Sequence, residues 1–376
     1  MIYLDANATT PLDPAVMSAM MPALAEVFAN PSSVHKPGQD ARALVDRARE
    51  QCGAALACDP REIVFTSGGT ESDALAVRGL GRRKVVTTAV EHPALLGPCA
   101  ELERSGVEVV RLGVDPSGRL DMNELDAALP GADLCSVMTA NNETGVVFPI
   151  EAIGEACRRR GVPFHTDAVQ AAGKMPLRIR DLAVDLLSCS AHKIGGPKGV
   201  GLLWARRGIQ LAPVQVGGHQ ERGRRAGTEN VAGIVGLGES LSRAVAAAPT
   251  ETLRLAALRD RLQAAARRIP GSHVAGEGAQ RICNTVNVAF EGCDGETLLV
   301  ALDLAGVAVS TGSACSSGSL EPSPVLLAMG YPPALARGAI RFSLWTGTTE
   351  EEIEEVCGIL PDVVARTRAR PDRRAR

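Results

Sequence analysis

The chain has 376 residues, of which 45% are apolar and 22% are charged; this composition is typical of a soluble globular protein and excludes a disordered or fibrous one. Its net charge of −3 and its 3% of aromatic residues give no reason to expect direct nucleic-acid binding. The first residues, MIYLDANATTPLD, are not an export signal, and no stretch reaches the ~18 apolar residues of a membrane span. We therefore expect a cytoplasmic protein without membrane contact, whose ten cysteines are reduced thiols.

Residues 1–14 are predicted to form an isolated short strand and turn, followed by helices over about 14–28 and 37–57. Seven β-branched runs are predicted as strands: Glu62–Thr66, Lys84–Ala89, Glu108–Leu112, Leu134–Thr139, Pro163–Asp167, Leu186–Ser190 and Gly199–Ala205. Segments with the length of a helix lie between most of these runs: Thr70–Leu80, Pro93–Ser105, Asn123–Leu129 and Ile150–Arg160. This alternation predicts an α/β fold with a seven-stranded, mainly parallel sheet, in which ligands bind beyond the carboxyl ends of the strands.

A glycine-rich stretch at 217–238 comes next, and residues 250–268 are predicted as an amphipathic helix that begins near a threonine cap. The remainder indicates a smaller α+β domain with the following strands and helices: Thr285–Phe290, Ala308–Ser310, Ile340–Leu344, Gly295–Ala305, Pro322–Met329 and Thr349–Ile359. We divide the chain into a large domain over 15–250 and a small domain made of 1–14 and 251–376. The final RTRARPDRRAR is typical of a solvated tail, with a docking site for an acidic partner as the alternative.

Polar side chains directly follow five of the predicted strands, in the segments SGGTESDAL, VEHP, TANNETG, HTDAVQ and SAHKIGGPKG. Each segment alone has an ordinary explanation: Thr70 as a helix cap, His92 as a structural histidine, Asn142 as part of an Asx turn. Together they supply an amine, a carboxylate, an imidazole and hydroxyl groups beside a helix N-terminus. Pyridoxal phosphate needs such a set, because a lysine forms its Schiff base and a carboxylate holds its ring nitrogen protonated.

The chain has only five lysines (Lys36, Lys84, Lys174, Lys193 and Lys198), and such a segment contains Lys193, close after its strand, and Lys198. With so few aromatic residues, His92 is the natural candidate to cover the cofactor ring. The motifs DANATTPLD, TSGGTESDAL, EHPA, NNETG, DAVQ and SAHKIGGPKGVG resemble the class V aminotransferase family of pyridoxal-phosphate enzymes, which has the fold type I of these transferases. The segments STGSACSSGSLEPSPVLLAMG and IRFSLWTGTTEEEI narrow the resemblance to cysteine desulfurases of the NifS/IscS-type group. The resemblance covers roughly residues 2–356, and the chain lacks the cysteine motif with adjacent histidines of the SufS type.

The resemblance implies a role for each matching residue. Those expected to bind pyridoxal 5'-phosphate are Gly69, Thr70, His92, Asn142, Asp167, Gln170, Ser190, His192, Lys193 and Thr228. Among them Lys193 matches the Schiff-base lysine, Asp167 the partner of the ring nitrogen, and Gln170 the donor to the phenolic oxygen. His92 matches the catalytic histidine that stacks on the ring and transfers protons. Thr70, Ser190 and His192 match phosphate ligands, whereas Asn142 and Arg341 match the residues that hold the substrate carboxylate, Arg341 by a bidentate fork.

Cys315 differs from most of the other cysteines, whose apolar or helical contexts are typical of small buried side chains. It lies in TGSACSSGS, a composition typical of a flexible loop, which a thiol needs if it collects sulfur in one place and delivers it in another. The resemblance matches Cys315 with the catalytic cysteine that takes sulfur from L-cysteine, leaving L-alanine and a persulfide. We expect no resident metal, although Cys315 could contact a cluster transiently.

The resemblance also implies a homodimer, because Thr228 matches a phosphate ligand that reaches across from the other subunit. The sulfur acceptor stays open between an iron–sulfur scaffold, a tRNA-thiolation relay and a nitrogenase-type scaffold. Two other functions remain possible: a different pyridoxal-phosphate reaction, such as transamination or selenocysteine cleavage, and a scaffold with a vestigial site. The loop around Cys315 argues against an aminotransferase, and the complete set of site residues argues against a vestigial site.

Three departures from the family pattern stand out. Gly69 replaces a common alanine and is expected to loosen its turn. Trp345 and the following Thr-Gly replace a more usual Gly-Arg-Phe stretch, with an expected effect on packing beside the substrate site. Pro361 is expected to interrupt the last helix, which puts the C-terminal partner surface in doubt.

Overall fold

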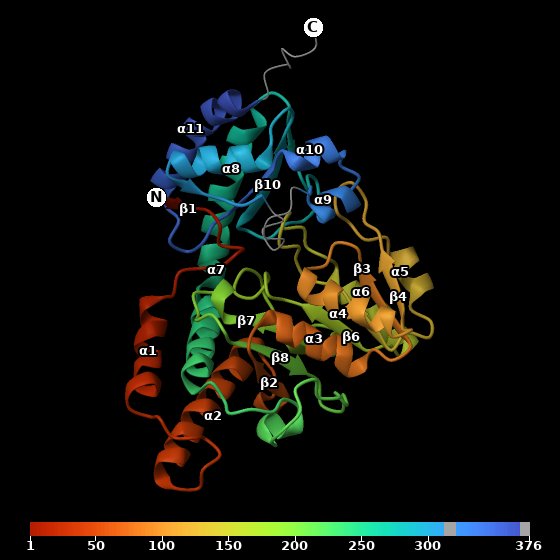
Figure 1. Cartoon of the computed structure of the whole chain (residues 1–376), viewed down its shortest axis with the longest axis vertical. Helices are drawn as coiled ribbons and strands as arrows, with labels where there is room; N and C mark the ends of the chain where they lie inside the picture. The colour runs from red at the N-terminus through yellow and green to blue at the C-terminus, as the bar shows by residue number, and fades with distance from the viewer. Residues whose placement is uncertain (312–320, 369–376) are drawn as a thin grey trace.

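The computed structural model describes residues 1–311 and 321–368, which form two parts connected by one long helix (Figure 1). The larger part is built on a seven-stranded sheet with the order β2-β8-β7-β6-β5-β3-β4. Its strands are β2 (Ile63–Thr66), β3 (Lys84–Thr88), β4 (Glu108–Leu112), β5 (Leu134–Ser136), β6 (Phe164–Asp167), β7 (Leu186–Ser190) and β8 (Gly201–Ala205). In this sheet only β8 runs against its neighbours. The predicted seven-stranded, mainly parallel sheet is therefore confirmed.

Helices connect these strands close to the predicted positions: α3 (Gly69–Leu80), α4 (Pro93–Arg104), α5 (Met122–Ala128) and α6 (Ile150–Arg160). Helix α6 shows why the local sequence specifies such an element. Glu151 lies in its first turn and three arginines lie in its last turn, which complements the helix dipole. Gly161 then ends the helix with φ of 68°, a left-handed conformation that glycine adopts without steric cost. The start and end of α6 both match the prediction.

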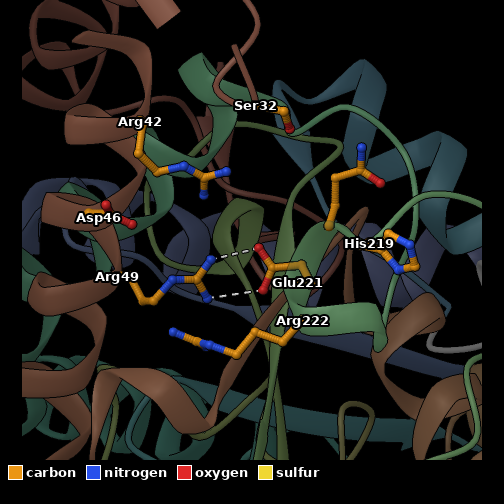
Figure 2. Close-up of a pocket in the computed structure, with 8 residues that line it drawn as sticks. Ser32, Arg42, Asp46, Arg49, His219, Glu221 and Arg222 are labelled. Atoms are coloured by element: carbon orange, nitrogen blue, oxygen red, sulfur yellow. Dashed lines mark hydrogen bonds and ion pairs between the residues drawn. The ribbon is translucent and has the colours of Figure 1, made fainter. Parts of the chain in front are cut away.

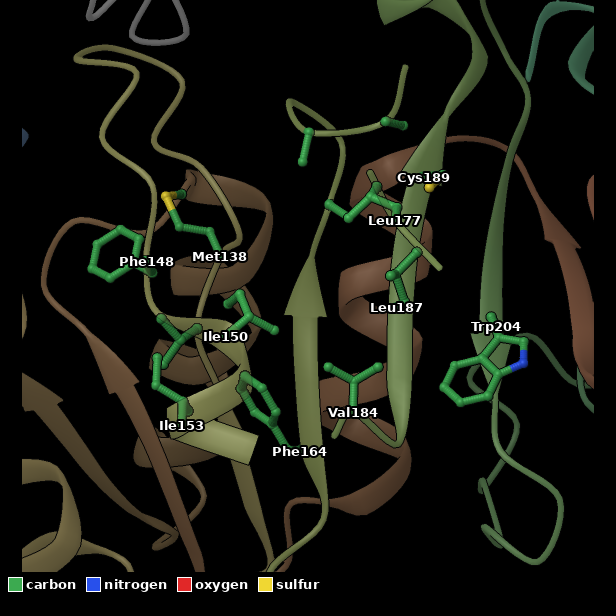
Figure 3. Packing of buried hydrophobic residues seen from close by; sticks show 14 of the residues in the cluster. Met138, Phe148, Ile150, Ile153, Phe164, Leu177, Val184, Leu187, Cys189 and Trp204 are labelled. Carbon is green, nitrogen blue, oxygen red and sulfur yellow. The ribbon is translucent and has the colours of Figure 1, made fainter. Parts of the chain in front are cut away.

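The core of the larger part lies between the sheet and its helices (Figure 3). Ile150 and Ile153 of α6 are buried beside Phe164 of β6, and Leu187 of β7 is fully buried in the same cluster. The neighbouring strands β6 and β7 are buried on both faces because helices cover both sides of the sheet. This packing fixes the strand ends, from which the polar segments extend.

The smaller part contains an antiparallel sheet of β12 (Ala339–Ser343), β10 (Thr285–Phe290) and β9 (Ser272–Val274). Its helices are α8 (Gly295–Leu304), α9 (Pro324–Ala328), α10 (Pro333–Arg337) and α11 (Glu350–Thr367). The first strand, β1 (Ile2–Tyr3), is not isolated as predicted, because it pairs in parallel with β11 (Val307–Ala308). Strand β9 and helix α10 have no counterpart in the prediction. A separate apolar cluster fills this part, with Phe290 and Phe342 fully buried.

The connecting helix α7 (Val231–Arg267) corrects another prediction, because it begins with the cap Asn230 and not near Thr250. The Thr250 hydroxyl donates to the Ala247 carbonyl inside the helix and caps nothing. One 18-residue window of α7 has a mean hydropathy of 1.3, so by length and composition this helix could cross a membrane. The sequence led us to expect no such stretch. Here α7 packs against α1 (Pro14–Ala25), α2 (Lys36–Leu56) and α11, so its apolar character is used within the fold.

Pro361 does not end the last helix, since α11 continues to Thr367. Proline removes one backbone donor, but it is exposed, and the buried side chains of Leu360 and Val364 anchor the turns on either side. The predicted domain boundary at 250 and 251 falls within α7, and we retain the two-domain division as a proposal. Cys315 and residues 369–376 of the arginine-rich end lie outside the described residues.

Short 3-10 helices complete the described chain: η1 (Pro60–Glu62), η2 (Ile179–Asp181), η3 (Ala191–Lys193) and η4 (Gln220–Gly223). Two of them matter for function. Helix η3 directly follows β7 and carries Lys193, whereas η4 lies in the segment that leads to Thr228.

Candidate active site

A cavity of about 310 Å³ lies beyond the carboxyl ends of the parallel strands. The structure brings ten predicted site residues into its lining: Gly69, Thr70, His92, Asn142, Asp167, Gln170, Ser190, His192, Lys193 and Arg341. The lining also contains residues to which the sequence assigned no role: Asn7, Ala8, Asp73, Ala94, Met138, Ala140 and Val169. The strand-end pattern therefore located one common site, and the first residues of the chain complete it.

The amine of Lys193 points toward the N-terminal segment. Its Nζ donates to the carbonyl of Ala8 at 2.8 Å and to the carbonyl of Asn7. The segment is held there by backbone contacts, since Thr10 donates to the His192 carbonyl at 2.8 Å. The motif DANATT was part of the family resemblance, but nothing in the sequence indicated that this segment contacts Lys193.

Asp167 ends β6 and is buried, and its Oδ1 accepts from the backbone of Val169 at 2.8 Å. Burial raises the pKa of Asp167, while this hydrogen bond and the charge of Lys193 act in the opposite direction. A cation placed against the carboxylate would lower the pKa again. Asp73 of α3 is also fully buried, and burial together with Asp167 raises its pKa well above the usual range. Two buried acidic side chains, each with a raised pKa, therefore line the cavity.

His92 is the N-cap of α4, and its Nδ1 accepts from the backbone of Ala94 at 3.0 Å. Burial, and then the charges of Lys193 and Arg341, lower the pKa of His92 to about 4, so the ring is neutral near pH 7. Because Nδ1 accepts, the ring hydrogen lies on Nε2. The structural and the functional interpretation of this histidine are therefore compatible, since one ring caps a helix and lines the cavity.

The N-terminus of α3 offers an anion site at one end of the cavity. Its N-cap is Gly68, with φ of 155°, and no side chain caps the exposed backbone donors. Ser190 Oγ is buried and has no hydrogen-bond partner among the described residues. His192 contacts Thr9 through Nδ1 at 3.2 Å, and burial, followed by nearby lysine charges, lowers its pKa to about 4. These donors fit a phosphate group.

Gly69 opens α3 beside this anion site. A Cβ at that position would lie 2.9 Å from Cγ2 of Val169 and 3.8 Å from the Cβ of Ser190. An alanine there requires Val169 to move, so the glycine leaves room at the cofactor end of the cavity.

Arg341 of β12 enters the cavity from the smaller part. Its Nη2 pairs with Asp5 at 2.8 Å and its Nη1 donates to the Asn142 carbonyl at 3.2 Å. The buried Nε has no hydrogen-bond partner within the described residues, so the guanidinium keeps one unused donor. The family resemblance implied a role for Arg341 but gave no sign of its pairing with Asp5.

Thr228 is exposed and does not line the cavity of its own chain. A larger cavity of about 450 Å³ lies closer to its segment, between α2 and η4 (Figure 2). A buried ion pair of Arg49 and Glu221 dominates this second cavity, and none of its lining residues was predicted as a site residue. It has no lysine amine, so the strand-end cavity is the better candidate for chemistry.

Comparison with known proteins gives a consistent picture. The model of the family described as Aminotransferase class-V matches residues 2–356. A cysteine desulfurase of Trichormus azollae is 49% identical over 375 residues, which cover 98% of this chain and 94% of that protein. A cysteine desulfurase of Klebsiella pneumoniae is 49% identical over 373 residues, with the same coverage.

Solved structures are similar over nearly the whole chain. A NifS-like protein has a TM-score of 0.90 and 34% identity, and the match covers 97% of this chain and 99% of that one. SspA in complex with cysteine has a TM-score of 0.80 and 34% identity, covering 92% of this chain and 99% of that one. These similarities confirm the predicted fold type I.

Proposed function

Since the chain belongs to the aminotransferase class-V family, we propose that it is a pyridoxal-phosphate-dependent cysteine desulfurase that converts L-cysteine to L-alanine and leaves the sulfur as a persulfide on Cys315. The observation that carries this proposal is that ten residues predicted from the sequence, among them Lys193, Asp167 and Arg341, line one cavity. The relatives named cysteine desulfurase, at 49% identity, and the similarity to a structure in complex with cysteine support the same reaction.

The residues in the cavity fit the cofactor. Lys193 would hold it covalently, Asp167 would face its ring nitrogen, and Ser190 with the N-terminus of α3 would bind its phosphate. When bound, pyridoxal phosphate supplies an electron sink that makes the Cα proton of an amino acid acidic. The buried position of Asp167 suits this task, because a carboxylate in a low-dielectric site gains strongly from facing a cation.

Lys193 is placed to accept the Cα proton at Nζ, and the carbonyls of Asn7 and Ala8 set the direction of the amine. The Nδ1 lone pair of His92 accepts the hydrogen bond from the Ala94 N–H at the start of α4, so the ring hydrogen is on Nε2. In this arrangement the imidazole donates a hydrogen bond into the cavity, and it accepts a proton only after its cap bond is broken. The geometry therefore favours Lys193 as the base.

Arg341 and Asn142 would hold the substrate carboxylate from the side of the smaller part. Asp5 neutralises part of the charge of Arg341 and keeps its fork in place, while the buried Nε retains a donor. This ion pair lowers the desolvation free energy of keeping the Arg341 guanidinium buried when no substrate is bound.

Cys315 would complete the reaction as a nucleophile. Its thiolate attacks the substrate sulfur, an S–S bond forms as the Cβ–S bond breaks, and the carbon takes the electron pair and then a proton. The product carbon skeleton leaves as L-alanine. The persulfide passes to an acceptor, for which we propose an iron–sulfur scaffold protein.

A homodimer in the cytoplasm forms part of the same proposal. Thr228 is exposed in its own chain, as expected for a phosphate ligand that serves a second subunit. Helix α1 and the residues after it also expose apolar side chains that a partner subunit would cover: Met17, Met21, Leu24 and Phe28.

Sulfide and alanine released from L-cysteine in the presence of a reductant test the reaction directly. Wild-type protein is expected to give equal amounts of both, and Cys315→Ser is expected to keep the bound cofactor but to release neither. Equal activity in the variant would remove the persulfide step. A cofactor-loaded wild type that releases no sulfide would contradict the proposed reaction.

A further inference from the structure

Lys174 is the only described lysine besides Lys193 whose amine contacts residues of the active-site cavity. It follows Gln170 by four residues, and its Nζ donates to Gln170 Oε1 at 3.0 Å. The same amine lies 3.5 Å from Asn7 Oδ1. On its other side, Gln170 donates from Nε2 to the carbonyl of Asn7 at 3.0 Å. Lys174 therefore contacts two amide side chains that both line the cavity.

Below its pKa of about 7 Lys174 is an ammonium group, which donates hydrogen bonds and accepts none, and its Nζ is the donor in both contacts. A carboxamide beside it must turn its oxygen toward the amine, and its NH2 group then points to the opposite side. For Gln170, one N–H of this NH2 group donates to the Asn7 carbonyl at 3.0 Å, and the second N–H remains for the cavity that Gln170 lines. For Asn7 the same logic holds, because Oδ1 accepts from Lys174 and from Asn284 Nδ2 at 3.1 Å, which leaves its NH2 for Thr285 at 2.8 Å.

We propose that Lys174 is a positioning residue of the active site, which fixes the Gln170 amide with its NH2 group toward the phenolic oxygen of the cofactor. Asn7 extends this effect, since its carbonyl accepts from both Gln170 and Lys193. The inference rests on the proposed function, because it needs the cofactor in this cavity. It adds a role for a lysine to which the site prediction assigned none.

The surroundings of Lys174 agree with this role. Within residues 1–311 and 321–368 it has no carboxylate partner, so its charge acts on the dipoles of the two amides. Burial is the main cause that lowers the pKa of Lys174 to about 7; Cys283 acts in the opposite direction, while Lys193 and Arg341 lower it further. Cys283 also donates to the Lys174 carbonyl at 3.8 Å. Burying a lysine without an ion pair costs desolvation free energy. The hydrogen bonds from Lys174 to the two amide oxygens offset part of it.

The test is a double-mutant cycle on the cofactor-loaded protein. The apparent pKa of the bound cofactor is read from its visible absorption spectrum against pH in wild type, Lys174→Met, Gln170→Ala and the double variant. A donor at the phenolic oxygen withdraws negative charge, so its loss raises this pKa. We expect each single variant to raise it by roughly one unit, the size of one hydrogen bond, and the double variant to raise it no further.

Two controls separate positioning from a general effect of charge or folding. Lys174→Arg keeps a donor-only group and should keep the wild-type value, and Lys36→Met removes an exposed lysine and should also leave it unchanged. Additive shifts in the double variant would show that Lys174 acts by its charge alone and would overturn the proposal. An unchanged pKa in Lys174→Met, with normal cofactor content, would also overturn it.

Failure of the proposed function gives a different result, namely a wild type that develops no visible band with pyridoxal phosphate. If Lys174→Met does not bind the cofactor or loses its circular dichroism spectrum, Lys174→Gln replaces it in the cycle. Glutamine can present either end of its amide to Gln170, so the orientation is lost while a polar contact remains. The expected shift and the contradicting outcomes are the same for both variants.

Discussion

The buried ion pair of Arg49 and Glu221 should be among the most important single interactions for the stability of the segment that leads to Thr228. Arg49 donates from both Nη atoms to the carboxylate, at 2.6 and 3.0 Å (Figure 2). It also donates to the Ile63 carbonyl at 2.9 Å and lies 4.5 Å from the ring centroid of Phe65. The two side chains are only 7% and 2% exposed. Arg49 thus connects α2, β2 and η4.

Arg49→Met keeps most of the aliphatic volume and removes the charge. The carboxylate of Glu221 then keeps only the backbone donor of Phe65 at 3.2 Å, and a buried charge without its partner costs about 3–5 kcal/mol. Arg61→Met is the matched control, because Arg61 pairs with Asp59 at the same 2.6 Å but the side chains are 72% and 35% exposed. There the expected loss is at most about 1 kcal/mol.

Urea denaturation followed by circular dichroism compares the two variants with wild type. The reasoning is refuted if Arg49→Met loses no more stability than Arg61→Met. The double variant Arg49→Met with Glu221→Leu should recover a large part of the loss, since an apolar pair of similar volume replaces the ion pair without stranding a charge. Its failure to recover would show that the hydrogen bonds to Ile63 and Phe65 dominate over the charge.

Further expectations concern the cavity. Ser190→Ala should weaken cofactor binding about tenfold, the loss of one phosphate hydrogen bond, as measured by fluorescence titration; unchanged affinity would place the phosphate elsewhere. Lys193→Ala should abolish turnover and the visible absorption of the bound cofactor, whereas Asp167→Ala should retain that absorption and lose most activity. Burial lowers the pKa of His165 from 6.5 to about 3. As the pH falls below 6.5, His165 is therefore protonated in the unfolded chain but stays neutral in the folded chain. Stability is therefore lost toward acid, and His165→Gln should lose less between about pH 7 and about pH 5 in urea midpoints; an equal loss would assign the acid sensitivity to other groups.

The parts of the fold that depend on local pattern were predictable. The seven strands appear as β-branched runs between turn residues, and the structure places each within a few residues of its prediction. The longest helix was predicted wrongly at its start for a physical reason. Pro249 and Thr250 resemble a helix beginning, yet tertiary packing carries α7 through both. Pro361 is the same case in α11.

The site was predictable as far as the strand ends define it. Residues that follow parallel strands meet at one edge whatever the rest of the chain does, so Lys193, Asp167 and Ser190 were found together. Contacts between distant segments carry no local signal. Arg341 pairs with Asp5 across 336 positions, and no periodicity in the sequence relates the two.

Asn7 shows most clearly what long-range contacts add, because it is 2% exposed and its hydrogen-bonding groups are fully used. Its backbone N–H donates to Ser343, its side-chain NH2 to Asn142 and Thr285, and its Oδ1 accepts from Asn284 and Lys174. Its carbonyl accepts from Gln170 and Lys193. A residue with every group satisfied has one favourable orientation, since any rotation leaves buried polar atoms unpaired. The two parts of the fold therefore meet at Asn7 in one defined arrangement, which holds Lys193 and Arg341, the proposed base and the proposed carboxylate-binding residue, in fixed relative positions.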